Sequence, residues 1–100
     1  MKSLRDPKRK PTHPGQLLRE DVLPALGMTQ TELAKRLGVS RLSVSELLLE
    51  KRGLSADMAV RVGRFTNATP ESWLHMQEAV DLWELERHPK RYQHIEPAAA

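Results

Sequence analysis

The chain of 100 residues has no cysteine and only four aromatic residues. Without cysteine it can form neither a disulfide bond nor a thiolate metal site. So few aromatic rings argue against a module that binds RNA by stacking its bases. No apolar stretch is long enough to span a membrane, and none follows the basic N-terminal residues as it would in a secretory signal. We therefore expect a cytoplasmic protein without a membrane anchor.

The charges are distributed unevenly along the chain. The formal net charge is +3, and the first ten residues carry five Lys or Arg against a single Asp. Residues 71–86, in contrast, carry five Asp or Glu and no Lys or Arg. A mildly basic chain whose positive charge precedes an acidic segment is compatible with binding to nucleic acid.

The length corresponds to one domain. Residues 1–11 are charged and contain proline, so we expect them to form a flexible basic arm. Residues 12–87 are expected to form the folded domain. Residues 88–100 include two prolines and three terminal alanines, and they are expected to form a flexible tail.

The spacing of apolar residues predicts an all-α fold of five helices, since no segment alternates β-branched and polar residues as a strand does. We expect the first helix to begin near Pro14 and to end or kink at Pro24, with Gly27 closing the connection. The four later helices are expected to begin at the capping residues Thr29, Ser40, Ser55 and Thr69.

Residues 29–48 contain the clearest functional signal. Thr29 and Glu32 have the spacing of a capping box, which marks the start of a helix. Gly38 is placed to end this helix in the left-handed conformation, and the next helix begins shortly afterwards at Ser40. A turn this short sets two helices at a steep angle. In this geometry one helix crosses the DNA backbone and the next enters the major groove.

The second of these helices has side chains that can read DNA. Its outward residues form the expected reading surface: Arg41, Leu42, Ser43, Ser45 and Glu46. Arg41 can donate to guanine, Leu42 can lie on a thymine methyl, and Glu46 can accept from cytosine. Phosphate contacts are expected on both sides of this surface, from Thr29, Gln30, Thr31, Lys51 and Arg52.

The segment TQTELAKRLGVSRLSVSELL resembles the helix-turn-helix of the lambda-repressor/Cro (XRE) group. With HPGQLLREDVLPALGMT before it, KRGLS after it and TPESWLHMQEAVDLW near the end, residues 13–87 resemble the HigA/VapI antitoxins. The resemblance implies a protein that represses its own operon as a dimer and neutralises a HigB-like ribonuclease toxin. It also implies base contacts from Arg41, Leu42, Ser43 and Glu46, and a phosphate contact from Gln30.

The chain departs from this family just after the reading surface. The family usually has Asn-Gly before its KRG motif, whereas this chain has Leu49 and Glu50. Without the glycine stop, we expect the helix to run about one turn further. We also expect Glu46 and Glu50 to repel phosphate and so to lower nonspecific affinity for DNA.

An apolar stripe runs along the last predicted helix, formed by Trp73, Met76, Val80 and Trp83. Such a stripe can pack on the chain's own helices. Further apolar residues widen it beyond one face, however, and this favours a homodimer interface through these four residues.

No group of residues indicates catalysis, a cofactor or a metal site, because none of the four histidines has the spacing of metal ligands. We therefore expect a DNA-binding protein and not an enzyme. Its expected partners are its own double-stranded operator, a second copy of the chain and a HigB-like toxin. Two alternatives stay open: a stand-alone XRE repressor without a toxin, and a protein-interaction module whose helix-turn-helix no longer binds DNA.

Overall fold

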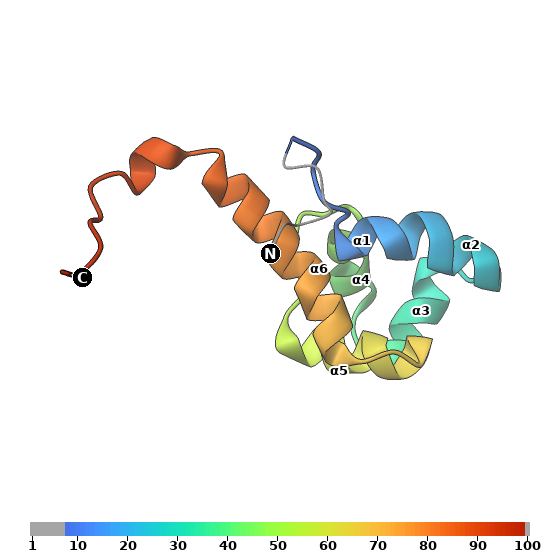
Figure 1. Ribbon diagram of the computed structural model, residues 1–100. Coiled ribbons are helices and arrows are strands. Elements are labelled where there is room, and N and C mark those ends of the chain that lie inside the picture. Colours follow the sequence, from blue (N-terminus) through green and yellow to red (C-terminus); the bar gives the residue numbers. More distant parts are fainter. Residues whose placement is uncertain (1–7, 100) are drawn as a thin grey trace.

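The structure consists of helices joined by short loops (Figure 1). The computed structural model describes residues 8–99, and this part of the chain contains no strand. Its elements are α1 (Pro14–Leu17), the π-helical turn η1 (Leu18–Val22), α2 (Leu23–Leu26), α3 (Gln30–Leu37), α4 (Arg41–Leu48), α5 (Ala56–Thr66), α6 (Pro70–Glu86) and the 3-10 turn η2 (Pro89–Arg91). Since α1, η1 and α2 are continuous, the all-α fold of five helical segments is confirmed. Within the described residues, no helix is both long and apolar enough to cross a membrane.

The first helical segment contains a π-helical turn directly before Pro24. Proline has no N–H to donate to the carbonyl four residues back, here that of Glu20, and its ring would clash with that carbonyl in a regular helix. The chain widens instead, so that the Leu23 N–H donates to the carbonyl of Leu18. The helix therefore does not end at Pro24, which was one of the two predicted outcomes, because the π turn lets it continue to Leu26. Gly27, with φ of 60°, ends the segment as predicted.

The two helices of the central motif begin and end as the sequence predicts. The Glu32 N–H donates to Thr29 Oγ1 over 3.1 Å, and the Thr29 N–H donates to the Glu32 carboxylate over 3.4 Å, which confirms the capping box. Gly38 ends α3 with φ of 71°. Ser40 caps α4 by accepting from the Ser43 N–H over 3.0 Å. A turn of three residues therefore joins α3 to α4.

The core lies beneath α3 and α4, where they meet the first segment and α5. Its largest fully buried aliphatic side chains are Leu18, Leu33, Val44, Leu47, Leu48 and Val62. Gly15 lets α1 pass directly against α4, since a Cβ at this position would overlap the Leu47 carbonyl. Trp73 on α6 closes the core from the other side, and its indole N–H donates to Thr66 Oγ1 over 3.0 Å.

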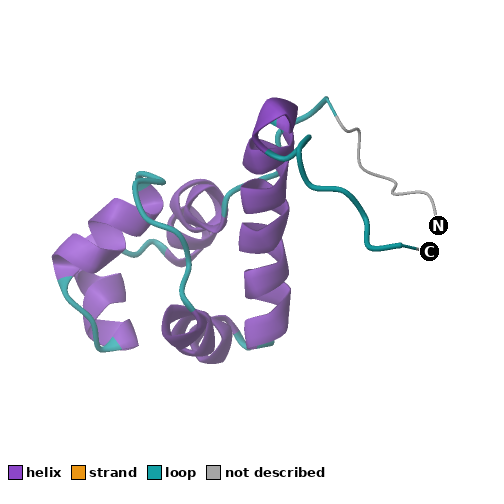
Figure 2. Cartoon of the chain, turned by 90° about the vertical axis from the view of Figure 1, so that its left-hand side faces the viewer, coloured by secondary structure: helices purple, strands orange, loops and turns teal. Residues whose placement is uncertain are grey.

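The last helix, α6, has a packed half and a projecting half. As far as Val80 it lies against the body of the domain, and beyond Val80 it extends away from the body and leads to η2 (Figures 1 and 2). The large apolar side chains exposed beyond this point are Leu82, Leu85, Tyr92 and Ile95. Most of the predicted basic arm lies outside the described residues. Of its described part, Lys10 Nζ lies 3.3 Å from the Glu84 carboxylate on α6.

Candidate nucleic-acid interface

The angle between α3 and α4 is supported by an arginine from outside the motif. Arg61 on α5 donates to the carbonyls of Leu37 and Gly38 over 2.9 Å and 3.3 Å. Its Nε also donates to Asp57 over 2.8 Å, which orients the guanidinium. A cation at the C-terminus of a helix satisfies free carbonyls and interacts favourably with the helix dipole. The chain therefore stabilises the turn between the two helices without a bound partner.

The start of α3 offers backbone N–H groups to an anion. Thr29 is occupied within the capping box, because its hydroxyl donates to Glu32 Oε1 over 3.0 Å while accepting from the Glu32 N–H. The N–H groups of Gln30 and Thr31 lie in the first turn, where the helix dipole favours negative charge. The phosphate contact at this end stays a prediction. It rests on Gln30 and Thr31, with Thr29 serving as the cap.

The outer side of α4 faces solvent with both charged and apolar side chains. Arg41 is exposed and has no hydrogen-bond or ion-pair partner among the described residues, and Ser45 is half-buried. Leu42 is 67% exposed, and Leu49, seven residues later on the same side, is 54% exposed. Leucines in this position can contact thymine methyl groups. Leu49 was not among the residues predicted for this surface, although its seven-residue spacing from Leu42 could have indicated it.

Arg52 folds back over α4 and contacts two residues of the reading surface. Its Nη1 donates to Ser43 Oγ and its Nη2 to Glu46 Oε1, both over 3.1 Å. Ser43 Oγ also accepts from Ser40 Oγ over 2.9 Å. Lys51, in contrast, is exposed and has no partner in the described part of the chain. Lys51 and Arg52, the two cations expected to contact phosphate, therefore have different surroundings. Of these two, Arg52 is hydrogen-bonded to the reading surface.

The end of α4 differs from the sequence expectation. The helix ends at Leu48 and does not run a turn further, because Glu50 adopts the left-handed conformation with φ of 61° that glycine usually supplies. Arg19 stabilises this end by donating from Nη1 to the Leu48 carbonyl over 2.6 Å. The same nitrogen lies 3.3 Å from Glu50 Oε2, so the charge of Glu50 is paired toward the first segment.

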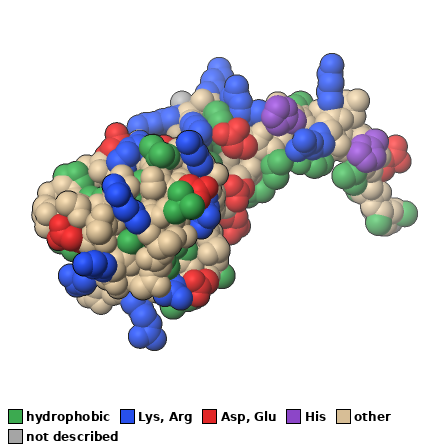
Figure 3. Space-filling view, turned by 180° about the vertical axis from the view of Figure 1, so that it is seen from behind, with side chains coloured by type: hydrophobic (Ala, Val, Ile, Leu, Met, Phe, Trp, Pro, Cys, Tyr) green, Lys and Arg blue, Asp and Glu red, His purple; other side chains and the backbone are tan. Residues whose placement is uncertain are grey.

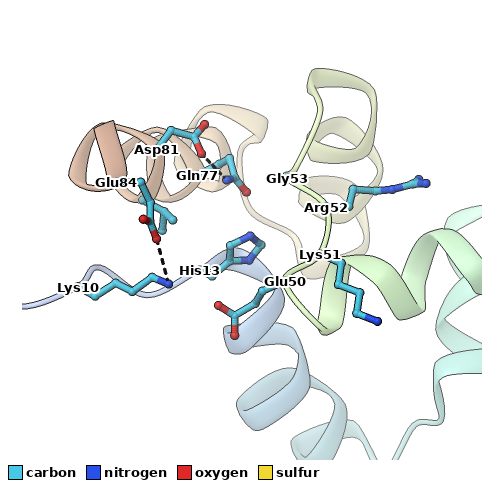
Figure 4. A pocket seen from close by; sticks show the side chains of 10 residues that line it. Lys10, His13, Glu50, Lys51, Arg52, Gly53, Gln77, Asp81 and Glu84 are labelled. Carbon is cyan, nitrogen blue, oxygen red and sulfur yellow. Dashed lines mark hydrogen bonds and ion pairs between the residues drawn. The ribbon is translucent and has the colours of Figure 1, made fainter. Parts of the chain in front are cut away.

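His13 is a buried helix cap to which the sequence analysis gave no role. Its Nδ1 accepts from the Gly15 N–H over 2.9 Å, and the residue is only 5% exposed. The ring borders a cavity of about 240 Å³, beside Glu50, Gln77 and Asp81 (Figure 4). Burial lowers the pKa of His13, although the nearby carboxylates oppose this shift. A histidine directly before the helix-starting proline was the signal that could have identified the cap.

The residues of the predicted α6 stripe have different environments. Trp73 and Val80 are each 5% exposed and lie inside the chain's own fold, and Met76 packs against the core. This burial corrects the expectation that Trp73 and Val80 face a partner. Trp83 is half-buried, with the Arg87 guanidinium 4.5 Å and Lys10 Nζ 6.0 Å from its ring. Trp83 is therefore the stripe residue that remains accessible on the projecting half of α6.

The distribution of charge separates the body from α6. Figure 3 shows Lys and Arg side chains spread over the body, and Asp and Glu side chains gathered where the body meets the projecting helix. Residues 29–52, which include α3 and α4, carry five Lys or Arg against three Glu, and this excess of positive charge favours DNA, whose affinity for proteins is dominated by its phosphates. With the short turn between its two capped helices, this surface defines a helix-turn-helix domain of the DNA-binding class.

Comparison with known proteins agrees with this class. A helix-turn-helix family model matches residues 18–74. An uncharacterized HTH-type transcriptional regulator of Haemophilus influenzae is 39% identical over 85 residues, which cover 85% of this chain and 78% of that protein. The antitoxin HigA-1 of Vibrio cholerae is 38% identical over 81 residues, covering 81% of this chain and 76% of the relative.

A solved structure extends the similarity to three dimensions. The Pseudomonas aeruginosa antitoxin HigA, solved with the higBA promoter, superposes with a TM-score of 0.81 at 35% sequence identity, covering 90% of this chain and all of that one. The chain belongs to the XRE-type helix-turn-helix family, in the group of HigA antitoxins. This membership confirms the resemblance found in the sequence motifs.

Proposed function

We propose that this protein is a sequence-specific DNA-binding autorepressor and the antitoxin of a HigBA-type toxin–antitoxin module. The observation that carries the proposal is the exposed outer side of α4, where Arg41 has no polar partner among the described residues and Leu42 is 67% exposed, within a helix-turn-helix that the chain itself stabilises. The Pseudomonas HigA structure, solved with promoter DNA, supports an operator as the ligand of this surface.

The proposed repressor is a homodimer formed through the projecting half of α6. Leu82 and Leu85 are 48% and 38% exposed there, next to the half-buried Trp83. A second copy would cover these side chains, as expected for apolar groups at a helix end without packing of its own. A dimer would place two α4 helices one turn of the duplex apart, or a multiple of it, to read two half-sites.

The proposed protein partner is a basic, HigB-like ribonuclease toxin in the cytoplasm. Support comes from the name of the Vibrio relative, antitoxin HigA-1, and from the carboxylates of α6, which complement a basic surface. Co-expression with the neighbouring reading frame tests this partner. A stable complex with a small basic protein is expected, and its absence would favour the stand-alone repressor.

Operator binding is tested with the DNA upstream of the protein's own reading frame. The parent protein is expected to prefer this DNA to a scrambled duplex. Arg41→Ala should weaken operator binding by about 1–3 kcal/mol and relax the preference at one base pair, because a bidentate contact to guanine is lost. Arg64→Ala, an exposed arginine on α5, is the matched control and should change little. An equal loss on both duplexes would show that Arg41 touches only phosphate.

A further inference from the structure

We infer that Arg52 reads a guanine in the major groove, with Glu46 and Ser43 as the residues that position it. This assignment rests on the proposed DNA binding and names a specificity residue outside α4 itself. It starts from the two hydrogen bonds of 3.1 Å that join the Arg52 guanidinium to Ser43 Oγ and Glu46 Oε1.

These two bonds place the guanidinium over the outer side of α4. Ser43 and Glu46 are three residues apart and are therefore neighbours on one side of the helix. Bonds from two different nitrogens of Arg52 restrict how its planar group can turn. Two of the five N–H donors are used in this way, and the other three have no partner among the described residues. Guanine presents two acceptors, O6 and N7, which suit a pair of adjacent guanidinium N–H donors.

The charges favour a base contact over a phosphate contact. An unpaired Glu46 on this surface would be repelled by the phosphates of DNA, and pairing with Arg52 cancels its charge. The pair as a whole carries no net charge, so Arg52 gains less from phosphate than the unpaired Lys51 does. Its remaining donors are still available for directional hydrogen bonds. In this arrangement Glu46 orients Arg52 and does not itself accept from cytosine, which replaces the role expected from the sequence.

The turn after α4 brings Arg52 to this position. The left-handed conformation of Glu50 ends the helix and reverses the chain, and Arg19 stabilises the reversal through the Leu48 carbonyl and Glu50. Figure 4 shows Arg52 pointing away from the cavity that holds His13 and Glu50. With Leu49 and Glu50 at these positions, the chain therefore makes a turn that brings the arginine back over the reading surface.

The test measures binding of the full chain to its own upstream DNA, to a scrambled duplex, and to duplexes in which each G·C pair of one half-site is replaced in turn. The variants are Arg52→Lys, Glu46→Gln and the two combined. Arg52→Lys keeps the charge but loses the paired N–H donors of the guanidinium. Lys51→Ala is the matched control for a phosphate contact. All three side chains lie at the surface, so thermal melts should show folded proteins.

Arg52→Lys is expected to lower the affinity for the operator about 10- to 100-fold and to change the affinity for the scrambled duplex little. One G·C replacement should weaken binding of the parent by a similar factor and should not change binding of Arg52→Lys. Lys51→Ala should lower the affinity for all duplexes by the same factor. Glu46→Gln should lose part of the preference for operator over scrambled DNA. In the protein that already carries Arg52→Lys, it should lower this preference no further.

Two results would overturn the assignment while leaving the proposed function intact. One is an equal loss for Arg52→Lys on operator and scrambled DNA, as a phosphate contact requires. The other is a loss of discrimination between operator and scrambled DNA on Glu46→Gln that persists beside Arg52→Lys, which would make Glu46 a reader in its own right. A parent protein without preference for its upstream DNA would overturn both the assignment and the proposed function.

Discussion

Both α4 and the projecting half of α6 expose leucines, but the described residues hold α4 in place more extensively than this part of α6. The inner side of α4 is buried in the core, its C-terminus receives a hydrogen bond from Arg19, and Arg52 bridges its outer side. Beyond Val80, Lys10 contacts α6 through Glu84 and Trp83, and Leu82 and Leu85 are 48% and 38% exposed.

The surface proposed to read DNA is therefore held within one chain, whereas the projecting half of α6 is the part that the proposed dimer would cover. A helix without tertiary packing is only marginally stable, because most helical stability in proteins comes from a buried apolar face. The leucines exposed by α4 lie on a helix whose inner side is packed in the core, so a base pair can contact them. Those of α6 lie on a helix end that a second copy would order and cover.

The largest effect on the DNA-facing region is expected from Gly15→Ala, which would force α1 away from α4. The new Cβ would overlap the Leu47 carbonyl, a backbone atom that cannot move by changing a rotamer. Overpacking typically costs 1–3 kcal/mol, and we expect a loss of about 3 kcal/mol or more in the free energy of unfolding, measured by urea denaturation. Operator affinity should fall with it.

Gly53→Ala is the control for this substitution, since the nearest atoms to its Cβ would be those of the Gln77 side chain, at 3.3 Å. It should therefore cost clearly less than Gly15→Ala. If the two substitutions were equally harmful, the close approach of α1 to α4 would not be what supports the proposed reading surface.

A smaller effect, confined to assembly, is expected from Leu82→Glu. Leu82 is 48% exposed, so its replacement should leave the monomer folded. In the proposed dimer it would bury an unpaired charge, and we expect the dimer dissociation constant to rise about 100-fold or more in sedimentation equilibrium. Operator binding should weaken and show a shallower salt dependence, because one half-site loses its phosphate contacts.

Leu26→Glu provides the matched comparison, because Leu26 is 56% exposed on α2. It should leave the dimer intact. Trp83 is less suitable for the test, since a glutamate there would be close to Lys10 and Arg87. A Leu82→Glu protein as dimeric as the parent would place the interface elsewhere than on α6.

The helices could be predicted because their signals are local. The capping box of Thr29 and Glu32 and the glycine stop at Gly38 depend on neighbours within a few residues, and the structure confirms both. The π turn before Pro24 was missed because proline in a helix usually indicates an end, and only the packing of the whole segment decides otherwise.

The candidate site could be predicted only in part, because its supports come from distant segments. Arg19 reaches the Leu48 carbonyl across 29 residues of sequence. The contact of Arg52 with α4 depends on the conformation of Glu50, for which no local rule applies. Likewise, the spacing of the α6 stripe identifies an apolar side, but it does not say that the chain's own core already covers Trp73.

His13 makes one support of α1 dependent on pH, and it lines the cavity between the first segment, α6 and the turn after α4. Its Nδ1 can accept from the Gly15 N–H only when unprotonated, and burial lowers its pKa below the usual value of 6.5. The unfolded chain therefore binds a proton more readily than the folded one. The stabilisation is fully present above pH 6.5 and is lost as the pH falls through the lowered pKa.

This loss should be visible in urea titrations between pH 7.5 and about 5. His13→Asn keeps a capping side chain that does not titrate, so it should flatten the pH dependence in that interval. If the parent and His13→Asn lost stability in parallel, other groups would account for the acid sensitivity.

The smallest effect is expected from Glu50→Gly, which restores the residue type usual for the left-handed position after α4. A non-glycine residue in this conformation costs about 1 kcal/mol, whereas a partly exposed ion pair such as that of Glu50 with Arg19 contributes less than about 1 kcal/mol. We therefore expect the free energy of unfolding to rise by about 0.5 kcal/mol.

Glu50→Ala is the control, because it loses the same ion pair without relieving the backbone. Its free energy of unfolding should be lower than that of the parent, so the two variants should differ by about 1 kcal/mol. Because Arg19 still bonds to the Leu48 carbonyl in both, α4 should end at the same residue and operator affinity should change little. Equal destabilisation by glycine and alanine would mean that the ion pair, and not the backbone conformation of Glu50, decides how firmly this end of α4 is held.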